Sequence, residues 1–419
     1  MDFAYDERTQ ALQAELLDFM QAHVYPAEPA FADVGEDGRP RAEFRRPAVL
    51  GELKAEARRR GLWNLFLPDD RDGAGLTLLQ YAPLAETSGR SPLVAPEAMN
   101  CAAPDTGNME LLHLFGTPEQ RQRWLRPMLD GELRSAYCMT EPMVASSDAA
   151  NLRTRIRRDG DEYVVDGRKW WSTGVLAEEC GLLVVVGVTD PAAGPRDRES
   201  VVLVPRDAPG VTVMRPLSVF GYLDSAHGGH GEVLFEGVRV PRENLLGEEG
   251  RGYALAQARL GPGRVHHCMR LVGIAERAFD LMCHRGYHRT TFGRLLADRD
   301  TFQDWVAEAR LRIDATRLLV LRAAWLIDRY GAREARTEIS AIKAAAPAMA
   351  EWVVDRAIQA YGGAGLAQDL PLAMLYAHAR GLRLADGPDE VHRMVVARRE
   401  LARYAPGAAG PTRGGALDT

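Results

Sequence analysis

The chain has 419 residues, of which 46% are hydrophobic, so it can bury a large core and form two or three domains. A formal net charge of -6 leaves no basic field that would attract nucleic acid or an anionic membrane surface. The five cysteines include no Cys-x-x-Cys pair, which argues against a disulfide framework or a zinc knuckle and favours a reducing cytoplasm. The N-terminus has no signal-peptide pattern, and no window approaches the roughly 18 apolar residues of a membrane span.

The first part of the chain has a helical period. Apolar residues recur on one face of a first helix, which Pro26 is expected to end, and residues 46–60 repeat the pattern. Further along, Thr117 is followed by a proline and, three residues on, by a glutamine, which is typical of a helix start. We therefore predict a helical domain over residues 1–133.

The period changes in the middle of the chain. Short runs rich in valine and aromatic residues, such as EYVVDGRKWW, LLVVVGV, SVVLVP and GEVLFEGVRV, lie between Ser135 and Pro241. Turn signals such as Arg-Asp-Gly-Asp separate them. This pattern predicts an antiparallel sheet or a small barrel, which we assign to a middle β domain over residues 134–245.

The helical period returns from Gly252 onward. Long helical segments separated by short breaks indicate a bundle, which we assign to residues 246–404. The last residues, 405–419, are rich in Gly, Ala and Pro and have no periodic face, so we predict a flexible tail. The expected fold class is α+β, with helical domains on either side of a β domain.

Two stretches of the middle domain could bind a ligand. In YCMTEPMVASSD, the hydroxyls of Thr140, Ser146 and Ser147 could hold a polar or anionic group, although a loop of this kind often satisfies only its own backbone. In KWWST, two adjacent tryptophans on one strand are expected on opposite faces. One would pack in the core and the other could cover a flat aromatic ligand, but two packing tryptophans explain the pattern equally well.

Three stretches of the C-terminal part also carry reactive side chains. Arg289 in RTTFGRLL could pair with a phosphate or be a solvated helix-end arginine. QAYGGAGL is either a helix stop or a loop that lets a ligand approach the backbone. In RVHHCM, His266, His267 and Cys268 are successive residues about 100° apart on a helix, so they cannot converge on one metal ion. We predict no metal site.

Taken in order, these motifs resemble the acyl-CoA dehydrogenases over about residues 5 to 404. They are T-E-P with a following S-S-D, K-x-W-x-T, R-x-x-F-G, Q-x-x-G-G-x-G and a carboxylate-Gly pair before the last helix. The resemblance implies an N-terminal helical domain, a middle β domain and a C-terminal bundle. It also implies an FAD-dependent enzyme that desaturates an acyl-CoA thioester, passes electrons to an electron-transfer flavoprotein, and forms a homodimer or a homotetramer.

The resemblance also implies roles for individual positions. In the family, the tryptophan of K-x-W-x-T covers the isoalloxazine ring and the threonine hydrogen-bonds it. The middle-domain positions that match flavin-binding residues are Tyr137, Met139, Thr140, Ser147, Trp171 and Thr173. Those that match residues reaching a partner subunit's FAD or its pyrophosphate are Arg289, Phe292, Gln359, Gly362 and Gly363. Those expected to contact substrate are Ser147, Arg264, Gly387 and Arg398.

Two positions depart from the family's pattern. TEPMVASSD is one residue longer than the commoner spacing, so the turn at Ser146 is expected to differ locally. A glutamine often found eight residues beyond the phenylalanine of R-x-x-F-G is Asp300 here, which weakens the transfer of that contact.

The stretch LADGPDEVH places Asp386 at the family's catalytic base, where the straight-chain enzymes have a glutamate. The reaction needs a base for the α-proton while a hydride leaves the β-carbon. Burial under the acyl chain should raise the pKa of such a carboxylate. Alternatively, Asp386 or Gly387 only begins the last helix, in which case the helix dipole would lower that pKa.

A narrower resemblance concerns RLGPGRVHHCMRLVGIAERA, RAIQAYGGAGL and LRLADGPDEVH. They look like the subgroup of acyl-CoA dehydrogenase domains that in animals are fused to an aminoglycoside-phosphotransferase-like kinase domain, with stand-alone bacterial relatives. In that subgroup aspartate is the norm at this position. Two alternatives to plain desaturation follow: processing of a 4-hydroxy- or 4-phospho-acyl-CoA, with a separate kinase as partner, or binding of acyl-CoA and flavin without turnover.

Overall fold

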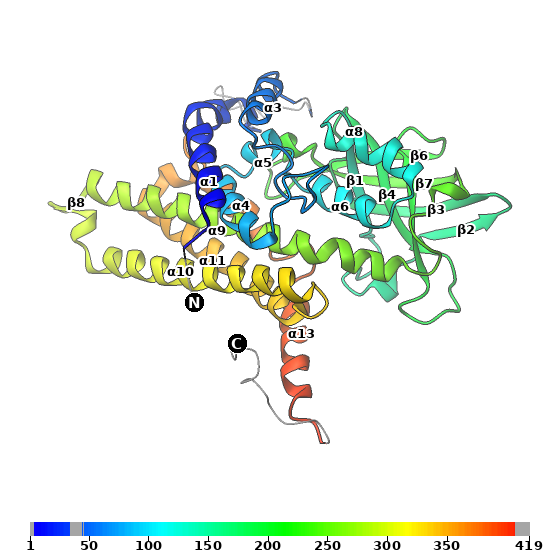
Figure 1. Ribbon diagram of the computed structural model, residues 1–419. Coiled ribbons are helices and arrows are strands. Elements are labelled where there is room, and N and C mark those ends of the chain that lie inside the picture. The colour runs from blue at the N-terminus through cyan, green and yellow to red at the C-terminus, as the bar shows by residue number, and fades with distance from the viewer. Residues whose placement is uncertain (1–3, 34–43, 45, 407–419) are drawn as a thin grey trace.

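The computed structural model describes residues 4–33, 44 and 46–406, and it has helices at both ends of the chain and a sheet between them (Figure 1). The expected α+β fold class is therefore confirmed. The predicted flexible tail falls, from residue 407 onward, outside the described residues.

The N-terminal helices begin with α1 (Glu7–Phe19), capped by Asp6, whose carboxylate accepts the backbone N–H of Thr9 at 3.0 Å. The expectation that Pro26 ends this segment is wrong. The chain continues through a π-helical turn into α2 (Tyr25–Ala27), where proline is tolerated because it opens a new turn. The other helices are α3 (Val49–Arg59), α4 (Leu78–Gly89), α5 (Ala95–Ala98), α6 (Asp105–Phe115), α7 (Pro118–Gln120) and α8 (Arg126–Leu129).

Within the described residues, the middle of the chain forms a seven-stranded sheet of order β1-β4-β2-β3-β7-β6, with β5 paired to β4. The expectation of an antiparallel sheet is only partly right, because β1 pairs with β4 in parallel, with Tyr137 opposite Val184. An apolar run does not reveal the direction of its strand. The strands are β1 (Arg134–Cys138), β2 (Arg155–Asp159), β3 (Glu162–Thr173), β4 (Cys180–Val188), β5 (Glu199–Pro205), β6 (Val211–Leu217) and β7 (His230–Pro241).

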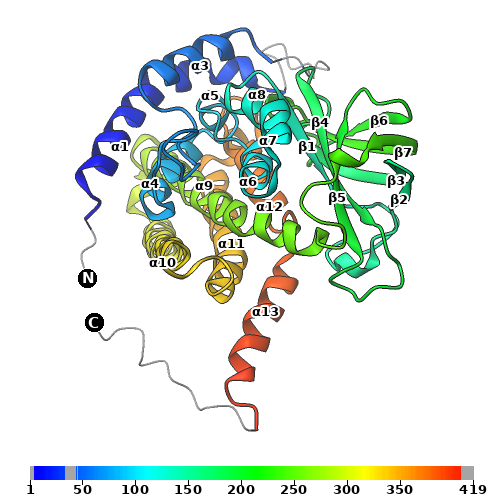
Figure 2. The same cartoon turned by 45° about the vertical axis from the view of Figure 1, so that its right-hand side comes forward.

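Strand β4 is apolar along its length because both of its faces are buried. Leu182 and Val184 belong to the large core that includes the helices, whereas Leu183 and Val185 belong to a second core inside the curled sheet. Successive side chains of a strand point to opposite faces, so this strand separates the two cores. Figure 2 shows the sheet lying beside α6 and α9 (Gly252–His288).

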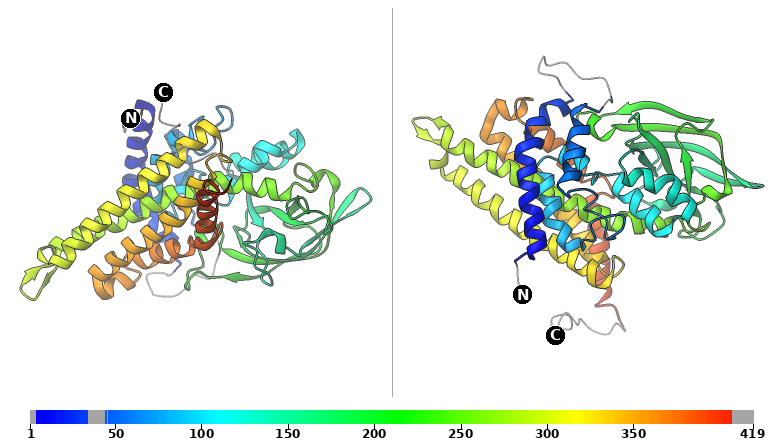
Figure 3. Two further views of the ribbon diagram at one scale, coloured as in Figure 1. Left: turned by 90° about the horizontal axis from the view of Figure 1, so that it is seen from below. Right: turned by 45° about the horizontal axis from the view of Figure 1, so that its top comes forward.

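The C-terminal part is built around α9, which runs from the sheet to the opposite end of the molecule, where β8 and β9 form a small hairpin (Figures 1 and 3). Helix α4 crosses α9 at close range, since a side chain on Gly273 would overlap the carbonyl of Glu86. Helix α13 extends away from the body of the molecule (Figure 2). The remaining elements are β8 (Thr290–Thr291), β9 (Arg294–Leu295), α10 (Asp300–Tyr330), α11 (Arg336–Tyr361), α12 (Leu372–Gly381) and α13 (Asp389–Ala402). None of the helices in residues 4–33 and 46–406 is both long and apolar enough to cross a membrane.

A buried ion cluster joins the N-terminal helices to the sheet. Glu97 is 3% exposed, accepts hydrogen bonds from Arg134 at 2.8 Å and Arg46 at 3.1 Å, and lies 2.8 Å from Nδ1 of His227. Burial raises the pKa of Glu97, but Arg134, Arg46 and His227 outweigh it and hold the pKa well below its usual value. Burial lowers the pKa of His227, and Asp224 and Glu97 more than reverse this, so both partners stay charged.

We predict that Glu97→Gln lowers the free energy of unfolding by about 3–5 kcal/mol, because it leaves Arg134 and His227 as buried charges without their shared anion. Urea unfolding at neutral pH measures the change. Glu162→Gln is the control: its partner Arg239 is about half exposed, and the loss should stay below about 1 kcal/mol. Equal losses in the two variants would contradict a stabilising role for the buried cluster.

Candidate functional site

Asp386 lies in the turn between α12 and α13, in a left-handed backbone conformation with φ 58°. Its carbonyl oxygen accepts the Nε–H of Arg264 at 3.0 Å and lies 3.2 Å from Nε2 of His392. Helix α13 begins at Asp389 with Pro388 as its N-cap residue, so Asp386 does not begin the helix and that alternative is wrong. The side chain of Asp386 is 21% exposed and therefore does not extend into bulk solvent.

His267 on α9 faces the carboxylate of Asp386, with Nε2 3.7 Å from Oδ2. The other ring nitrogen, Nδ1, lies 3.3 Å from the guanidinium of Arg270. An arginine can only donate, so Nδ1 accepts and the ring proton sits on Nε2, toward Asp386. Burial and the charge of Arg270 hold the pKa of His267 well below its usual value. The ring therefore meets Asp386 as a neutral N–H dipole.

The expectation that burial raises the pKa of Asp386 is wrong for the net effect. Burial does act in that direction, but His267 and the cations of Arg259, Arg264 and Lys343 outweigh it, and the pKa lies below its usual value. The cause is therefore a set of neighbouring side chains and not a helix dipole. The carboxylate is ionised, as a proton acceptor must be.

The surroundings of Asp386 are polar and positively charged. Lys343 of α11 is fully buried and donates to the carbonyl of Leu382 at 2.5 Å. The guanidinium of Arg259 stacks on the ring of Tyr137 at 3.9 Å, and the Tyr137 hydroxyl is buried without a hydrogen-bond partner. Burial raises the pKa of Tyr137 to about 12, so its hydroxyl remains a donor available to a ligand.

The second group of predicted residues lies on the sheet. Trp170 and Trp171 do not simply alternate, because a bulge between Lys169 and Ser172 puts Trp171 in a left-handed conformation with φ 52°. Trp171 is 39% exposed, while the indole nitrogen of Trp170 is buried without a partner. The hydroxyl of Thr173 lies 2.9 Å from Nδ1 of His230. An exposed indole beside a hydroxyl can hold a flat ligand.

The loop after β1 satisfies much of its own backbone, as the alternative interpretation of this stretch predicts. Ser146 accepts the N–H of Glu141 at 2.8 Å, and the Glu141 carboxylate pairs with buried Lys169 at 2.9 Å. Lys169 also donates to the carbonyl of Met139 at 2.8 Å. The structure leaves the side chains of Thr140 and Ser147 exposed, where they can meet a ligand.

The remaining predicted residues lie at the other end of the molecule. Arg289 and the fully exposed Phe292 belong to the β8–β9 hairpin, far from the sheet in both Figure 1 and Figure 3. The contact of Arg285 with the Tyr361 ring, at 5.0 Å, keeps the 359–363 loop near this end. There, Gln359, Gly362 and Gly363 are exposed, and a side chain on either glycine would meet nothing within 4 Å. A single chain therefore does not bring the predicted residues of the sheet together with those of the hairpin and the 359–363 segment.

Of the residues expected to contact substrate, the structure brings Arg264 and Gly387 to Asp386. Gly387 has φ 105°, and a side chain there would approach Nε2 of His392. Arg398 is exposed on the third turn of α13, away from this group. Within the described residues, no group of three or more His, Cys, Asp or Glu side chains is arranged to hold a metal ion.

His267 and Lys343 are functional candidates that the sequence reasoning missed. The run RVHHCM draws attention to His267 only as a metal ligand, yet this residue is three positions after Arg264 and so shares its side of the helix. Lys343 is a single cation in the apolar stretch AIKAAAPA, which is a signal of a buried, partnered charge. The contact of either residue with Asp386 depends on tertiary packing and has no local signal.

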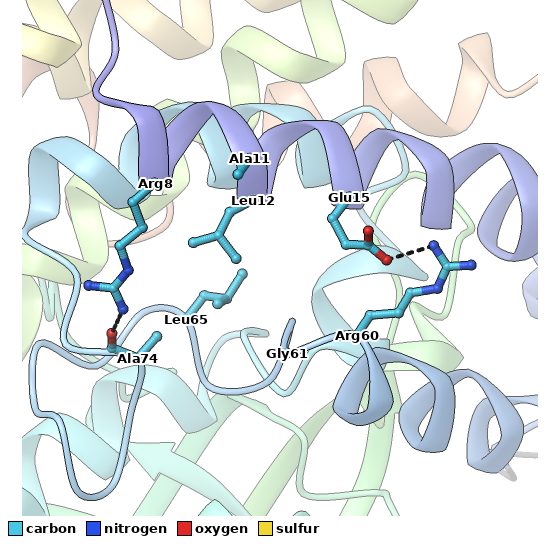
Figure 4. A pocket seen from close by; sticks show the side chains of 8 residues that line it. All are labelled: Arg8, Ala11, Leu12, Glu15, Arg60, Gly61, Leu65 and Ala74. Atoms are coloured by element: carbon cyan, nitrogen blue, oxygen red, sulfur yellow. Dashed lines mark hydrogen bonds and ion pairs between the residues drawn. The ribbon is translucent and has the colours of Figure 1, made fainter.

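A hollow of about 350 Å³ lies in the N-terminal helices, away from Asp386 (Figure 4). An ion pair between Arg60 and Glu15 at 2.9 Å closes one side, and Arg8 donates to the carbonyl of Ala74 at 2.5 Å on the other. It contains none of the predicted site residues.

Three consecutive segments match models of known families: Acyl-CoA dehydrogenase, N-terminal domain over residues 6–132, middle domain over 136–238, and C-terminal domain over 250–401. The chain is 53% identical over 403 residues to "Probable acyl-CoA dehydrogenase FadE2" of Mycobacterium tuberculosis, covering 96% of this chain and 98% of that protein. It is 49% identical over 401 residues to "Acyl-CoA dehydrogenase family member 11" of Rattus norvegicus, covering 95% of this chain but only 51% of that protein. The solved "Structure of a putative acyl-CoA dehydrogenase from Mycobacterium abscessus" is similar with a TM-score of 0.93 and 52% identity, covering 96% of this chain and 100% of that one.

Proposed function

The chain belongs to the acyl-CoA dehydrogenase family of oxidoreductases, and we propose from this that it is an FAD-dependent enzyme that desaturates an acyl-CoA thioester between its α and β carbons. One observation carries the proposal: Asp386, which the resemblance assigns to the family's base position, has a largely buried, ionised carboxylate and is anchored through its own backbone to Arg264.

The residues present fit FAD. Trp171 offers an exposed aromatic face and Thr173 a hydroxyl beside it, which suits an isoalloxazine ring. Thr140 and Ser147 are exposed in the loop after β1 and offer hydroxyls, and the open backbone of Gly362 and Gly363 suits a pyrophosphate. When bound, FAD would accept the hydride from the β carbon.

Asp386 would take the α-proton of the thioester onto its carboxylate. Its lowered pKa keeps it in the basic form, and the hydrogen bond from Arg264 to its backbone carbonyl holds it in place. The shorter side chain of aspartate makes this positioning more important than it would be for glutamate. Burial of the site by the acyl group would exclude water and raise the basicity of the carboxylate.

A second candidate substrate class is a 4-hydroxy- or 4-phospho-acyl-CoA. The cations of Arg259, Arg264 and Lys343 and the unpartnered hydroxyl of Tyr137 favour an acyl group that carries a polar or anionic substituent. A plain aliphatic chain would desolvate these groups without replacing their hydrogen bonds. The chain spans about half the length of the animal relatives it matches.

We further propose an electron-transfer flavoprotein as the acceptor of the electrons and the cytoplasm as the compartment, in fatty acid metabolism. Five free cysteines, four of them buried, suit a reducing environment.

We propose a homodimer, or a tetramer formed from two dimers, in which each cofactor site takes residues from two copies. The support is that Trp171 and Thr173 belong to β3 of the sheet, whereas Arg289 and Phe292 flank β8, which Figure 1 shows at the far end of the bundle. The contact of Arg285 with Tyr361 keeps Gln359, two residues earlier, near that end as well. A fully exposed phenylalanine is also better explained by a covering partner than by contact with water.

Anaerobic mixing with a panel of butyryl-, octanoyl-, 4-hydroxyacyl- and 4-phosphoacyl-CoA tests the activity. We expect at least one thioester to bleach the flavin absorbance, and Asp386→Asn to slow this by at least about a hundredfold because the base is lost. Mass spectrometry distinguishes plain desaturation, which gives a product two mass units lighter, from further loss of the 4-substituent.

The matched control is Glu390→Gln, which neutralises an exposed carboxylate in the first turn of α13 and should bleach at the wild-type rate. Full activity of Asp386→Asn would remove Asp386 from the mechanism. Failure of the whole panel to bleach a flavin-loaded wild type would favour a binding protein without turnover.

His267→Leu should move the acid limb of the kcat/KM profile to higher pH, by up to about one unit. Losing the N–H of His267 removes part of what lowers the pKa of Asp386, so the carboxylate would be protonated, and inactive, at a pH where the wild type is still ionised.

His266→Leu is the matched control for this profile. His266 is the preceding residue, packs against Phe66 and Tyr81, and has no hydrogen-bond partner on either ring nitrogen. Its replacement should leave the acid limb in place. A limb that shifts equally in both variants would show that the effect comes from disturbed packing of α9.

Co-expression of Trp171→Ala and Arg289→Ala chains tests the shared site. Each homodimer should lose FAD, whereas the purified heterodimer should retain FAD in one of its two sites, because that site receives an intact sheet from one copy and an intact hairpin from the other. The control heterodimer pairs an Arg289→Ala chain with a Gln359→Ala chain, so both defects lie at the hairpin end. Each of its two sites then receives a defective hairpin end, and it should bind no FAD. Recovery in both heterodimers, or in neither, would contradict the proposed assembly.

A further inference from the structure

A hydroxyl, an imidazole and a carboxylate form a line behind Trp171. The Thr173 hydroxyl lies 2.9 Å from Nδ1 of His230, and Nε2 of the same ring lies 3.2 Å from a carboxylate oxygen of Asp224. The side chains of His230 and Asp224 are only 13% and 18% exposed. The three residues come from the end of β3, the start of β7 and the loop that precedes it.

The structure holds this line in place from two sides. The carboxylate of Asp33, in the N-terminal part, accepts the backbone N–H groups of Leu223 and Asp224 at 2.7 and 2.9 Å. The ring of His230 contacts the indole of Trp171, with ring centroids 5.4 Å apart. Asp224 itself adopts φ 56°, a left-handed conformation that aspartate enters more readily than most residues.

The direction of the hydrogen bonds follows from the carboxylate. Burial raises the pKa of Asp224, but the charge of His227 and the hydrogen bond from His230 outweigh it and the pKa lies well below its usual value, so Asp224 only accepts. The proton of His230 therefore sits on Nε2. With that proton on Nε2, the lone pair of Nδ1 faces the Thr173 hydroxyl, which donates its proton to the ring and keeps its oxygen free to accept from a ligand.

We propose that Asp224 and His230 are positioning residues that fix the proton of the Thr173 hydroxyl and thereby tune the redox potential of the bound flavin. The inference rests on the proposed function, in which Thr173 contacts the isoalloxazine ring. The ring nitrogen that receives the hydride is an acceptor in oxidised flavin and carries an N–H in reduced flavin. A Thr173 oxygen that can accept therefore favours the reduced ring, which would raise the potential.

The same line without a cofactor role would be a simple buried hydrogen-bond chain that stabilises the loop before β7. That role predicts a loss of folding stability in variants of His230 or Asp224 and no change in the flavin. A potential measured against a reference dye separates the two roles, since it does not require an acyl-CoA substrate.

The test measures the midpoint potential of the FAD-loaded protein by dye-coupled reductive titration. We expect His230→Leu, Asp224→Asn and Thr173→Val each to lower the potential. In the double variant of His230→Leu with Thr173→Val, the shift should equal that of Thr173→Val alone, because His230 acts only through the hydroxyl. His230→Asn should restore much of the wild-type value, since its amide oxygen can accept near the position of Nδ1.

Gln120→Ala is the matched control, because the buried amide of Gln120 donates to the carbonyls of Glu243 and Leu245 just after β7 and contacts none of the three residues of the line. It should lower the unfolding temperature and leave the potential unchanged. Additive shifts in the double variant, or wild-type potentials in folded His230→Leu and Asp224→Asn, would overturn the inference while leaving the proposed function intact. A protein that cannot be loaded with FAD would overturn both.

Discussion

The close crossing of α4 and α9 is the constraint on which the site depends. Side chains on Gly89 or Gly273 would overlap the backbone of the facing helix, so the two helices touch without intervening atoms. The contact fixes the position of α9 relative to α4. Arg264, His267 and Arg270 follow one another at three-residue intervals along α9. The contacts of Asp386 with Arg264 and His267 are therefore set by a backbone contact well away from the turn that carries it.

Buried carboxylates in this molecule show how neighbouring groups decide their charge. Glu97 and Asp386 are surrounded by cations and directed N–H groups, and each has a lowered pKa. Glu110 is buried to a similar degree but has only Arg259 to oppose burial, and its pKa is raised to about 8. Burial alone would thus have raised the pKa of Asp386, and its cationic neighbours are what keep it available as a base.

The elements that the sequence predicts correctly are those that depend on neighbouring residues in the chain. The capping pair of Thr117 and Gln120 forms as expected, with hydrogen bonds of 3.2 and 3.1 Å in the two directions. The parallel pairing of β1 and the bulge at Trp171 could not be predicted, because strand direction and register depend on partners distant in sequence. The same limit applies to the candidate site. The order of motifs identifies Asp386, but its contact with His267 spans 119 positions of the chain and has no local signature in the sequence.

Three largely buried histidines in the region of Asp386 provide polar side chains that carry no charge. Burial lowers the pKa of His378 and His392 to about 4, and the pKa of His267 is also well below its usual value, so these rings are neutral. Lysine or arginine at these positions would add charge to a region that already contains Arg264, Arg270 and Lys343, at a large cost in desolvation. Leucine at His267 or His392 would remove the polar ring that faces the carboxylate or the carbonyl of Asp386. A neutral imidazole supplies a polar contact without a further buried charge, which is why the positive surroundings of the carboxylate remain compatible with a folded core.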